Sequence, residues 1–262
     1  MEIDKLKLYM GIDYPVTTEF SIHTPTIEEI TRYGEKDFYN MAYSVVMEPV
    51  DMKWQLWDQG IDWTKVDKFQ FFTDIIAPTL TNDMTKIIFG KYLDFSKMVK
   101  IYDEKIDEYV LIQDIKLEFD ENEEEHSDKE SLTFQIRIDR YTHALIKEIM
   151  RETYGFAVRT DKPANEVTKI AQIEDEKDEY MENKDKPYKS TLFNYISAMV
   201  NSAEFKHDEK SVFKMNIYAF MNSVRRINKI KNATLLLQSG YSGFGVSLKD
   251  ISKDELDWVG DV

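Results

Sequence analysis

The sequence predicts an α+β protein that is predominantly α-helical, with a small antiparallel β element in the middle of the chain. The 262 residues include only 9 Gly and 6 Pro, which favours long regular elements over many tight turns. Apolar side chains recur at helical spacing in the first and last parts of the chain. Between residues 99 and 138 the spacing changes to the alternation that is typical of strands.

Residues 1–98 are expected to form an N-terminal strand followed by an aromatic-rich helical region. Apolar and polar side chains alternate through residues 19–23, and we predict a half-buried strand there within a strand-and-turn region. Thr24 and Pro25 then predict the start of a helix, with Thr24 as its N-cap. Gly34 is expected to end or bend that helix.

The rest of this region is also expected to be mainly helical. A second helix is predicted to begin at Asp51 and to stop at Gly60. Residues 66–80 are dense in apolar side chains and predict a buried helix. Residues 86–89 are interpreted as a short strand.

Residues 99–138 are predicted to form the β element. Residues 99–102 and 109–112 flank a polar turn, and residues 132–138 alternate as a further strand. The acidic run at residues 118–130 is expected to be a mobile surface loop, because its charge density opposes burial.

Residues 139–262 are predicted to form a C-terminal helical region. The charge-dense residues 165–186 indicate a solvated helix or a linker, and apolar stripes follow at residues 192–200 and 213–227. The tail from Leu235 onward is expected to be irregular. We expect the three regions to form one compact body.

Composition limits the kinds of partner that the chain can have. Its 34 basic and 49 acidic residues give a net charge of -15, which repels nucleic acid phosphates and anionic lipid. The absence of cysteine excludes disulfides and thiolate chemistry. The sequence has no apolar run long enough to span a membrane and no signal peptide at its start. We therefore expect a protein of the host cytoplasm that binds neither nucleic acid nor membranes, with the virion as the alternative location.

The sequence carries no recognisable catalytic motif. The four histidines share no metal-binding frame, and we interpret them as isolated surface or packing residues: His23, His126, His143 and His207. The acidic run lacks the alternate spacing and the central glycine of a calcium loop. Residues 240–245 lack the Lys-Ser or Lys-Thr pair of a phosphate loop, and we expect a tight turn there. We predict no catalytic residue, no cofactor and no metal ion.

Two clusters are candidates for binding a partner. Trp54, Trp57 and Trp63 lie within ten positions, and aromatic anchors dominate protein interfaces, although core packing is the alternative fate of these side chains. Arg225 and Arg226 form a basic cluster late in a predicted helix, where cations also offset the negative end of the helix dipole.

Several stretches, spread in one order over nearly the whole chain, resemble a family of proteins from phages and prophages of Gram-positive bacteria. They are Ile22-His23-Thr24-Pro25-Thr26-Ile27-Glu28-Glu29-Ile30 with Tyr33-Gly34-Glu35, Leu56-Trp57-Asp58-Gln59-Gly60-Ile61-Asp62-Trp63, Leu93-Asp94-Phe95-Ser96-Lys97, Asn183-Lys184-Asp185-Lys186-Pro187-Tyr188-Lys189-Ser190, Ile196-Ser197-Ala198-Met199-Val200-Asn201, and residues 217–232. The resemblance implies a place in tail morphogenesis and supplies no catalytic residue.

These observations leave four hypotheses about function. The first is a non-enzymatic phage assembly protein, specifically a tail assembly chaperone, that binds other phage proteins such as the tape measure or tail tube protein. The second is a structural virion component of the tail or neck. The third is a metal-dependent hydrolase or nuclease, which requires two or three acids to converge in a pocket. The fourth is an inhibitor of a host defence protein with an acidic, nucleic-acid-like surface.

Overall fold

The computed structural model describes residues 3–117, 133–242 and 251–260. These residues form a mainly helical protein with a small antiparallel sheet in the middle of the chain, which confirms the predicted fold class. The acidic run at residues 118–130, predicted to be a loop, lies outside the described residues.

The chain divides into two compact units. The first consists of Met1–Asp4, Asp13–His23 and Lys36–Tyr188, and the second of Lys5–Ile12, Thr24–Glu35 and Lys189–Val262. This grouping differs from the predicted ranges 1–98, 99–138 and 139–262, because N-terminal segments pack with the C-terminal helices. That the chain forms one compact body stays a prediction.

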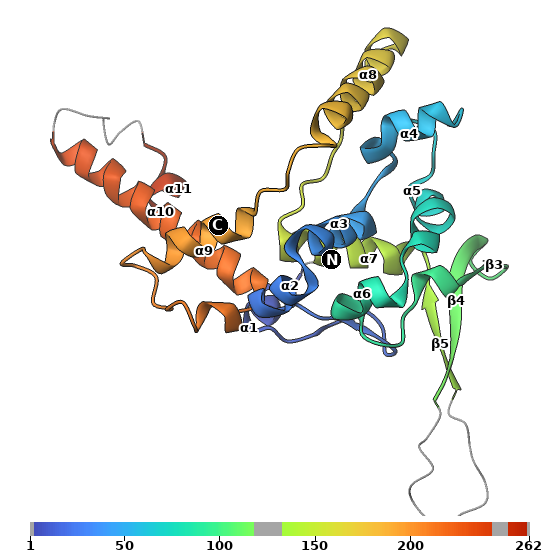
Figure 1. Ribbon diagram of the computed structural model, residues 1–262, viewed down its shortest axis with the longest axis horizontal. Helices are drawn as coiled ribbons and strands as arrows, with labels where there is room; N and C mark the ends of the chain where they lie inside the picture. Colours follow the sequence, from blue (N-terminus) through green and yellow to red (C-terminus); the bar gives the residue numbers. More distant parts are fainter. Residues whose placement is uncertain (1–2, 118–132, 243–250, 261–262) are drawn as a thin grey trace, which may run out of the picture. The chain divides into compact units, whose positions relative to one another are not determined.

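The first unit contains most of the helices and both sheets (Figure 1). Its helical elements are α3 (Glu35–Val46), η1 (Pro49–Met52), α4 (Lys53–Asp58), α5 (Lys68–Phe71), η2 (Phe72–Ile76), η3 (Ala77–Thr79), α6 (Asn82–Phe89), η4 (Phe95–Lys97), α7 (Arg140–Tyr154) and α8 (Glu166–Asn183). Its strands are β1 (Tyr14–Pro15), β2 (Ser21–Ile22), β3 (Val99–Asp103), β4 (Glu108–Lys116) and β5 (Thr133–Ile138).

The larger sheet has the order β3-β4-β5, with both pairs antiparallel. Val99 pairs with Ile112 across the first pair, and Leu111 pairs with Ile138 across the second. Ile136 and Ile138 are fully buried, and they alternate with half-exposed or exposed residues along β5 as a one-sided strand requires. The predicted β element at residues 99–138 is therefore confirmed.

Aromatic side chains from α5, η2 and α7 form the core of the first unit. His143 of α7 stacks on Phe72, with ring centroids 3.9 Å apart and an interplanar angle of 22°. Phe72 also meets Phe95 edge to face at 5.8 Å. Burial lowers the pKa of His143 to about 3, so this histidine is neutral at pH 7 and packs as an aromatic ring.

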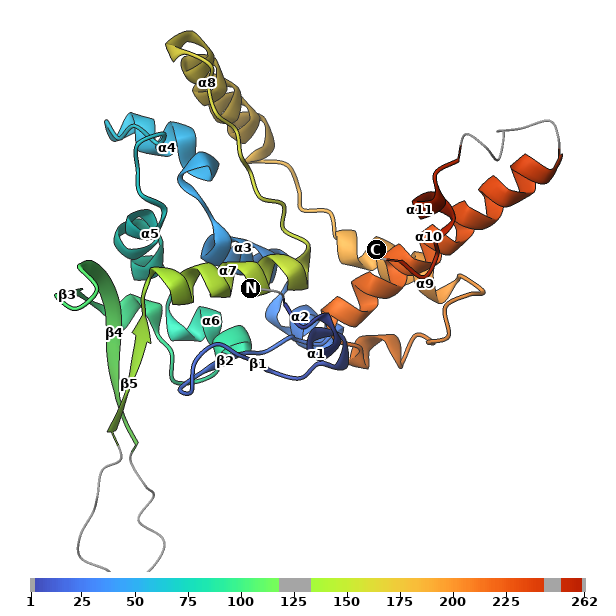
Figure 2. The same cartoon turned by 180° about the vertical axis from the view of Figure 1, so that it is seen from behind.

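The second unit is built around one long helix. Its elements are α1 (Lys5–Met10), α2 (Ile27–Tyr33), α9 (Thr191–Val200), η5 (Val212–Lys214), α10 (Ile217–Ser242) and α11 (Lys253–Leu256). Figure 2 shows α1 and α2 beside the start of α10. Asn216 fixes this junction, because its side-chain amide donates to the carbonyl of Tyr9 at 3.0 Å and its backbone bridges to Thr26.

Two local predictions from the sequence are wrong. Residues 86–89 are the end of helix α6 rather than a strand, and the buried Thr85, Ile88 and Phe89 show the spacing of a helix. Residues 5–10 form helix α1 inside the region expected to be strand and turn. In a stretch of only four to six residues, helical and strand spacing are too similar to separate.

The tail of the chain also differs from its prediction. Helix α10 continues from Leu235 through Gly240 to Ser242, where irregular structure and a tight turn were expected. A glycine destabilises a helix by only about 1 kcal/mol, which is small beside the cooperative growth of a long helix. The remaining residues of the predicted turn, 243–245, lie outside the described part of the chain.

The predicted N-cap of the first long helical segment is displaced by two residues. Thr26, not Thr24, caps α2: its hydroxyl accepts from the backbone of Glu29 at 3.2 Å, and the Glu29 carboxylate accepts from the backbone of Thr26 at 2.7 Å. Thr24 is instead buried, with a hydroxyl that has no hydrogen-bond partner among the described residues.

The different environments of Thr24 and Thr26 allow the position of the cap to be tested with two variants. Thr26→Ala removes the capping box and is expected to lower the free energy of unfolding by about 1 kcal/mol in urea titrations. Thr24→Val removes a buried hydroxyl without a partner and should leave stability unchanged or raise it. The opposite order of the two variants would place the cap at Thr24.

Candidate functional site

A cleft of about 800 Å³ lies in the first unit. Three segments line it: η1 with the residue before it, the loop after α4 with the start of α5, and the segment that leads into α8 with the start of that helix. The lining residues are Glu48, Pro49, Val50, Asp62, Trp63, Thr64, Lys65, Val66, Lys68, Arg159, Thr160, Asp161, Lys162, Pro163, Asn165, Glu166 and Lys169.

Local backbone structure brings these segments together. Gly60 follows α4 with a φ of 75°, a left-handed conformation that favours glycine, and the chain reverses there. Asp62 then accepts from the backbone of Thr64 at 3.1 Å, which tightens the turn around Trp63. On the opposite segment, Asn165 caps α8 by accepting from Thr168 at 2.9 Å.

One end of the cleft is closed by an ion pair between the two segments. The Lys169 ammonium of α8 lies 2.7 Å from the carboxylate of Asp62, and this lysine is only 5% exposed. Glu166 lies 3.4 Å from the same ammonium. The hydrogen bond from Lys169 holds the pKa of Asp62 far below its usual range, so this carboxylate is ionised at pH 7.

The other end is formed by the buried carboxylate of Glu48. Its Oε1 atom lies 2.7 Å from the Lys147 ammonium and 3.0 Å from the Arg151 guanidinium, both on α7. Its Oε2 atom lies 3.0 Å from Lys68 of α5. Burial raises the pKa of Glu48, but hydrogen bonds and charge from Lys147, and bonds from Lys68 and Arg151, lower it to about 2.

Trp63 lies in the wall between these two ends. It is 5% exposed, and its indole N–H has no hydrogen-bond partner among the described residues. The buried ammonium of Lys53 lies 5.6 Å from the centre of its ring and 3.3 Å from Asp161. Trp63 therefore brings an apolar surface to the cleft, while its N–H is buried within the wall.

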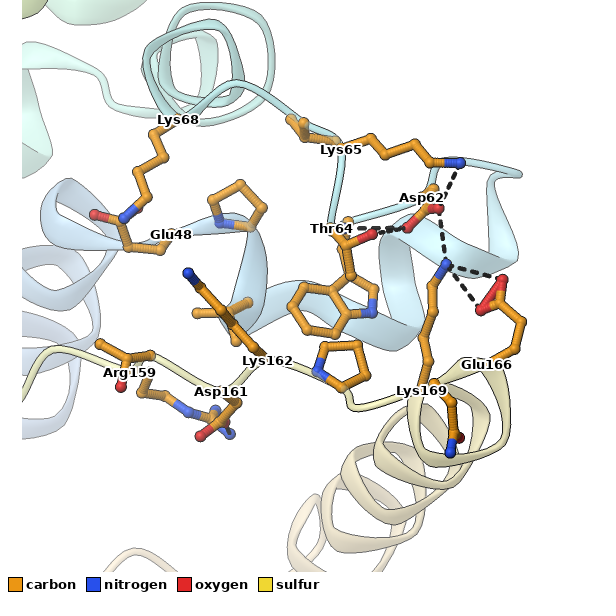
Figure 3. A pocket seen from close by; sticks show the side chains of 17 residues that line it. Glu48, Asp62, Thr64, Lys65, Lys68, Arg159, Asp161, Lys162, Glu166 and Lys169 are labelled. Carbon is orange, nitrogen blue, oxygen red and sulfur yellow. Dashed lines mark hydrogen bonds and ion pairs between the residues drawn. The ribbon is translucent and has the colours of Figure 1, made fainter.

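Figure 3 shows how the charged side chains are distributed. Glu48 and Lys68 lie on one side, Asp62 and Lys169 lie on the other, and the side chain of Lys162 extends between them. Among the described residues, no carboxylate forms an ion pair with Lys162, which is exposed.

The other two tryptophans of the predicted cluster attach α8 to α4. The ring of Trp54 lies 5.4 Å from that of Tyr180 and beneath the Lys177 ammonium, and its backbone N–H donates to Glu176 at 3.1 Å. Trp57 is 39% exposed. The three tryptophans thus have different environments instead of forming one exposed patch, and their role in binding a partner stays a prediction.

The basic cluster lies in the second unit, on α10. The Arg226 guanidinium donates to the carbonyls of Trp258 and Gly260, the latter at 2.8 Å, so it fastens the segment after α11. Arg225 is half-buried and lines a hollow between α10 and α11. A role for this pair in binding a partner also stays a prediction.

Sequence analysis missed a groove of about 470 Å³ along α9 in the second unit. Leu192 and Met199 of α9 are buried, whereas Phe193 is 67% and Tyr195 38% exposed. The apolar stripe predicted at residues 192–200 therefore lies only partly in the core. The one available signal was that this helix is apolar around most of its circumference.

Comparison with known proteins supports a phage origin. Residues 182–261 match the family model described as the YomV second domain, a phage-derived family, and the match supports a phage protein. The matched residues include α9, α10 and α11 of the second unit. No curated protein and no solved structure matches the chain.

Two negative findings concern the described residues alone. Within them, no group of three or more histidine or acidic side chains is arranged to hold a metal ion. In the same part of the chain, no helix combines the length and the hydropathy needed to cross a membrane.

The ion cluster at Glu48 predicts a large stability effect. Glu48→Gln leaves the buried Lys147 and Arg151 without their carboxylate, and the free energy of unfolding should fall by about 3 kcal/mol. The control is Asp83→Asn, which removes an exposed ion pair with Lys86 and should cost no more than about 0.5 kcal/mol. Equal effects of the two variants would show that the cluster does not hold the first unit together.

The ion cluster at Glu48 also predicts that the stability difference between wild type and Glu48→Gln depends on pH. The pKa of Glu48 is lowered from 4.5 to about 2 in the folded protein, so its stabilisation is complete above pH 4.5 and is lost as the pH falls toward 2. The difference between wild type and Glu48→Gln should therefore shrink below pH 4.5 in urea titrations. A difference that grows there has the wrong sign for this cluster.

Proposed function

We propose that the protein is a non-enzymatic phage assembly protein that binds other phage proteins, and that its specific role is that of a tail assembly chaperone. The supporting observation is the exposed ring of Phe193 on α9, which lines an apolar groove. Exposed apolar surface at a groove is a common mark of a protein-binding site. This face lies within the residues that match the phage-derived family model.

The groove combines apolar lining with polar groups, as sites that bind a partner's apolar side chain do. Ile196, Val200 and Phe213 line it together with Phe193, and Glu35 and Glu209 add polar groups at its border. Glu35 also accepts from the backbone of Leu192 at 2.9 Å, which holds the start of α9 in place. A preformed apolar hollow with a polar border limits the ordering cost of binding.

The charge of the chain is compatible with this role. A net charge of -15 keeps a protein with an exposed apolar face in solution until the partner arrives. We propose the host cytoplasm as the place of action, and the tape measure or tail tube protein as the partner.

The test is capture of phage proteins from cells in which the phage is multiplying. Burying a phenylalanine contributes about 1.5–3 kcal/mol, so Phe193→Asp should reduce the captured amount at least tenfold. The control Val167→Asp makes the same change at a side chain that is 78% exposed on α8. Circular dichroism should show that both variants keep the helical content of the wild type.

Capture of a tail protein by wild type and by Val167→Asp, but not by Phe193→Asp, is the expected result. A chaperone should also be absent from purified particles, because it leaves before the virion is complete. Stoichiometric presence in particles would identify a structural component instead, and unchanged capture by Phe193→Asp would remove α9 from the interface.

A further inference from the structure

We propose that the cleft of the first unit binds an acidic, partly apolar peptide segment of the partner protein, with carboxylates near Lys68 and Lys162 and an apolar side chain against the ring of Trp63. This inference rests on the proposed function in that the ligand is part of a protein. It concerns a different surface from α9, on the other unit of the chain.

The charge of the cleft is opposite to that of the chain. Its described lining contains more cations than carboxylates, whereas the whole chain has a net charge of -15. The cations are Lys65, Lys68, Arg159, Lys162 and Lys169, and the carboxylates are Glu48, Asp62, Asp161 and Glu166. The cleft thus carries a small positive surplus within an acidic protein, which favours an anionic ligand.

The surplus of positive charge in the cleft is concentrated near Glu48. Lys147, Arg151 and Lys68 all face this single carboxylate, and Lys147 and Arg151 are largely buried. Lys68 is 64% exposed and so is accessible to a second carboxylate. Because the two buried cations are shielded little by solvent, they add to the attraction for an anion beside Lys68.

Lys162 supplies a cation that no described carboxylate pairs, and Trp63 supplies part of the apolar wall. Lys162 forms no ion pair with any described carboxylate and extends into the cleft (Figure 3). The indole N–H of Trp63 is buried and has no hydrogen-bond partner among the described residues. A ligand that packs against the ring would change the surroundings of this N–H, so its resonance can report on binding.

The apolar lining of the cleft indicates that the ligand also contains apolar side chains. Pro49, Val50, Val66 and Pro163 line the cleft beside the ring of Trp63. A volume of about 800 Å³ is in the range that accommodates a ligand of drug size or a short peptide. An acidic peptide with apolar side chains matches both the wall and the charges.

The same charges argue against nucleic acid as the ligand. Lys162 apart, each lining cation already has a carboxylate partner within 4.0 Å among the described residues. One or two ligand carboxylates would balance the surplus, but a run of phosphates would leave most of its charge uncompensated near an acidic protein.

The test follows the indole N–H resonances of the full chain, which has 4 tryptophans, by NMR. The probe is an acetylated, amidated octapeptide that alternates leucine with aspartate and glutamate; its control has asparagine and glutamine in place of the acids. Trp63→Phe identifies the resonance of Trp63. The acidic peptide should shift this resonance saturably, and the amide peptide should not.

Charge reversals locate the contact. Lys162→Glu and Lys68→Glu should each weaken the apparent affinity severalfold, whereas Lys86→Glu, which reverses an exposed charge on α6, should not. No saturable shift up to about 1 mM peptide, or equal shifts with the amide peptide, would overturn the proposal. Equal saturation by inorganic phosphate or a single-stranded oligonucleotide would overturn it in favour of a phosphate ligand.

The two proposals fail separately. If the cleft does not bind the peptide while Phe193→Asp still loses the tail protein, only the inference about the cleft is overturned. If the peptide binds in the cleft but no phage protein is captured, the cleft is supported and the proposed function is contradicted.

Discussion

The buried carboxylate of Glu48 contacts cations from two other elements, and the arrangement of the first unit depends on this cluster. Lys147 and Arg151 reach it from α7, and Lys68 reaches it from α5. Arg151 also donates to the carbonyl of Val46 at 3.0 Å, which joins the end of α3 to α7. Removing charges from water costs several kcal/mol per ion, so the geometry is tolerated only because every charge in the cluster has a partner.

The cleft and its neighbouring helix follow from that cluster. η1 begins directly after Glu48, and its successor α4 presents Trp54 and Trp57 to α8. Because α8 is charge-dense with few buried residues, aromatic rings, ion pairs and a backbone hydrogen bond hold it in place. Helix α8 can therefore shift with less loss of buried area than α7 can. Because α8 also forms one wall of the cleft, such a shift would change the width of the cleft.

The sequence was sufficient for the elements whose signals are local. Alternation located β3, β4 and β5, and Gly34 marked the end of α2 where the structure has it. The capping threonine was misplaced because Thr24 and Thr26 both precede an apolar residue and an acid. The strand predicted at residues 86–89 failed because a stretch of four residues carries too little periodicity.

The sites depend on contacts that no local pattern encodes. Glu48 and Lys147 are separated by 99 positions, and Asp62 and Lys169 by 107, so neither pair could be predicted from spacing. An apolar stripe identifies a helix face but not what covers it, which is why the exposure of Phe193 was not foreseen. The tryptophans were recognised as notable, yet only the fold shows that Trp63 lines a cleft while Trp54 packs against α8.

The most direct test of the central claim, that this protein works by binding another phage protein, is lysine cross-linking followed by mass spectrometry in cells that are producing the phage. Lys189 and Lys210 are exposed near the α9 groove, and Lys162 is exposed in the cleft. The account predicts cross-links from these lysines to the tape measure or tail tube protein. Cross-links only to host proteins, or only between copies of this chain, would contradict it.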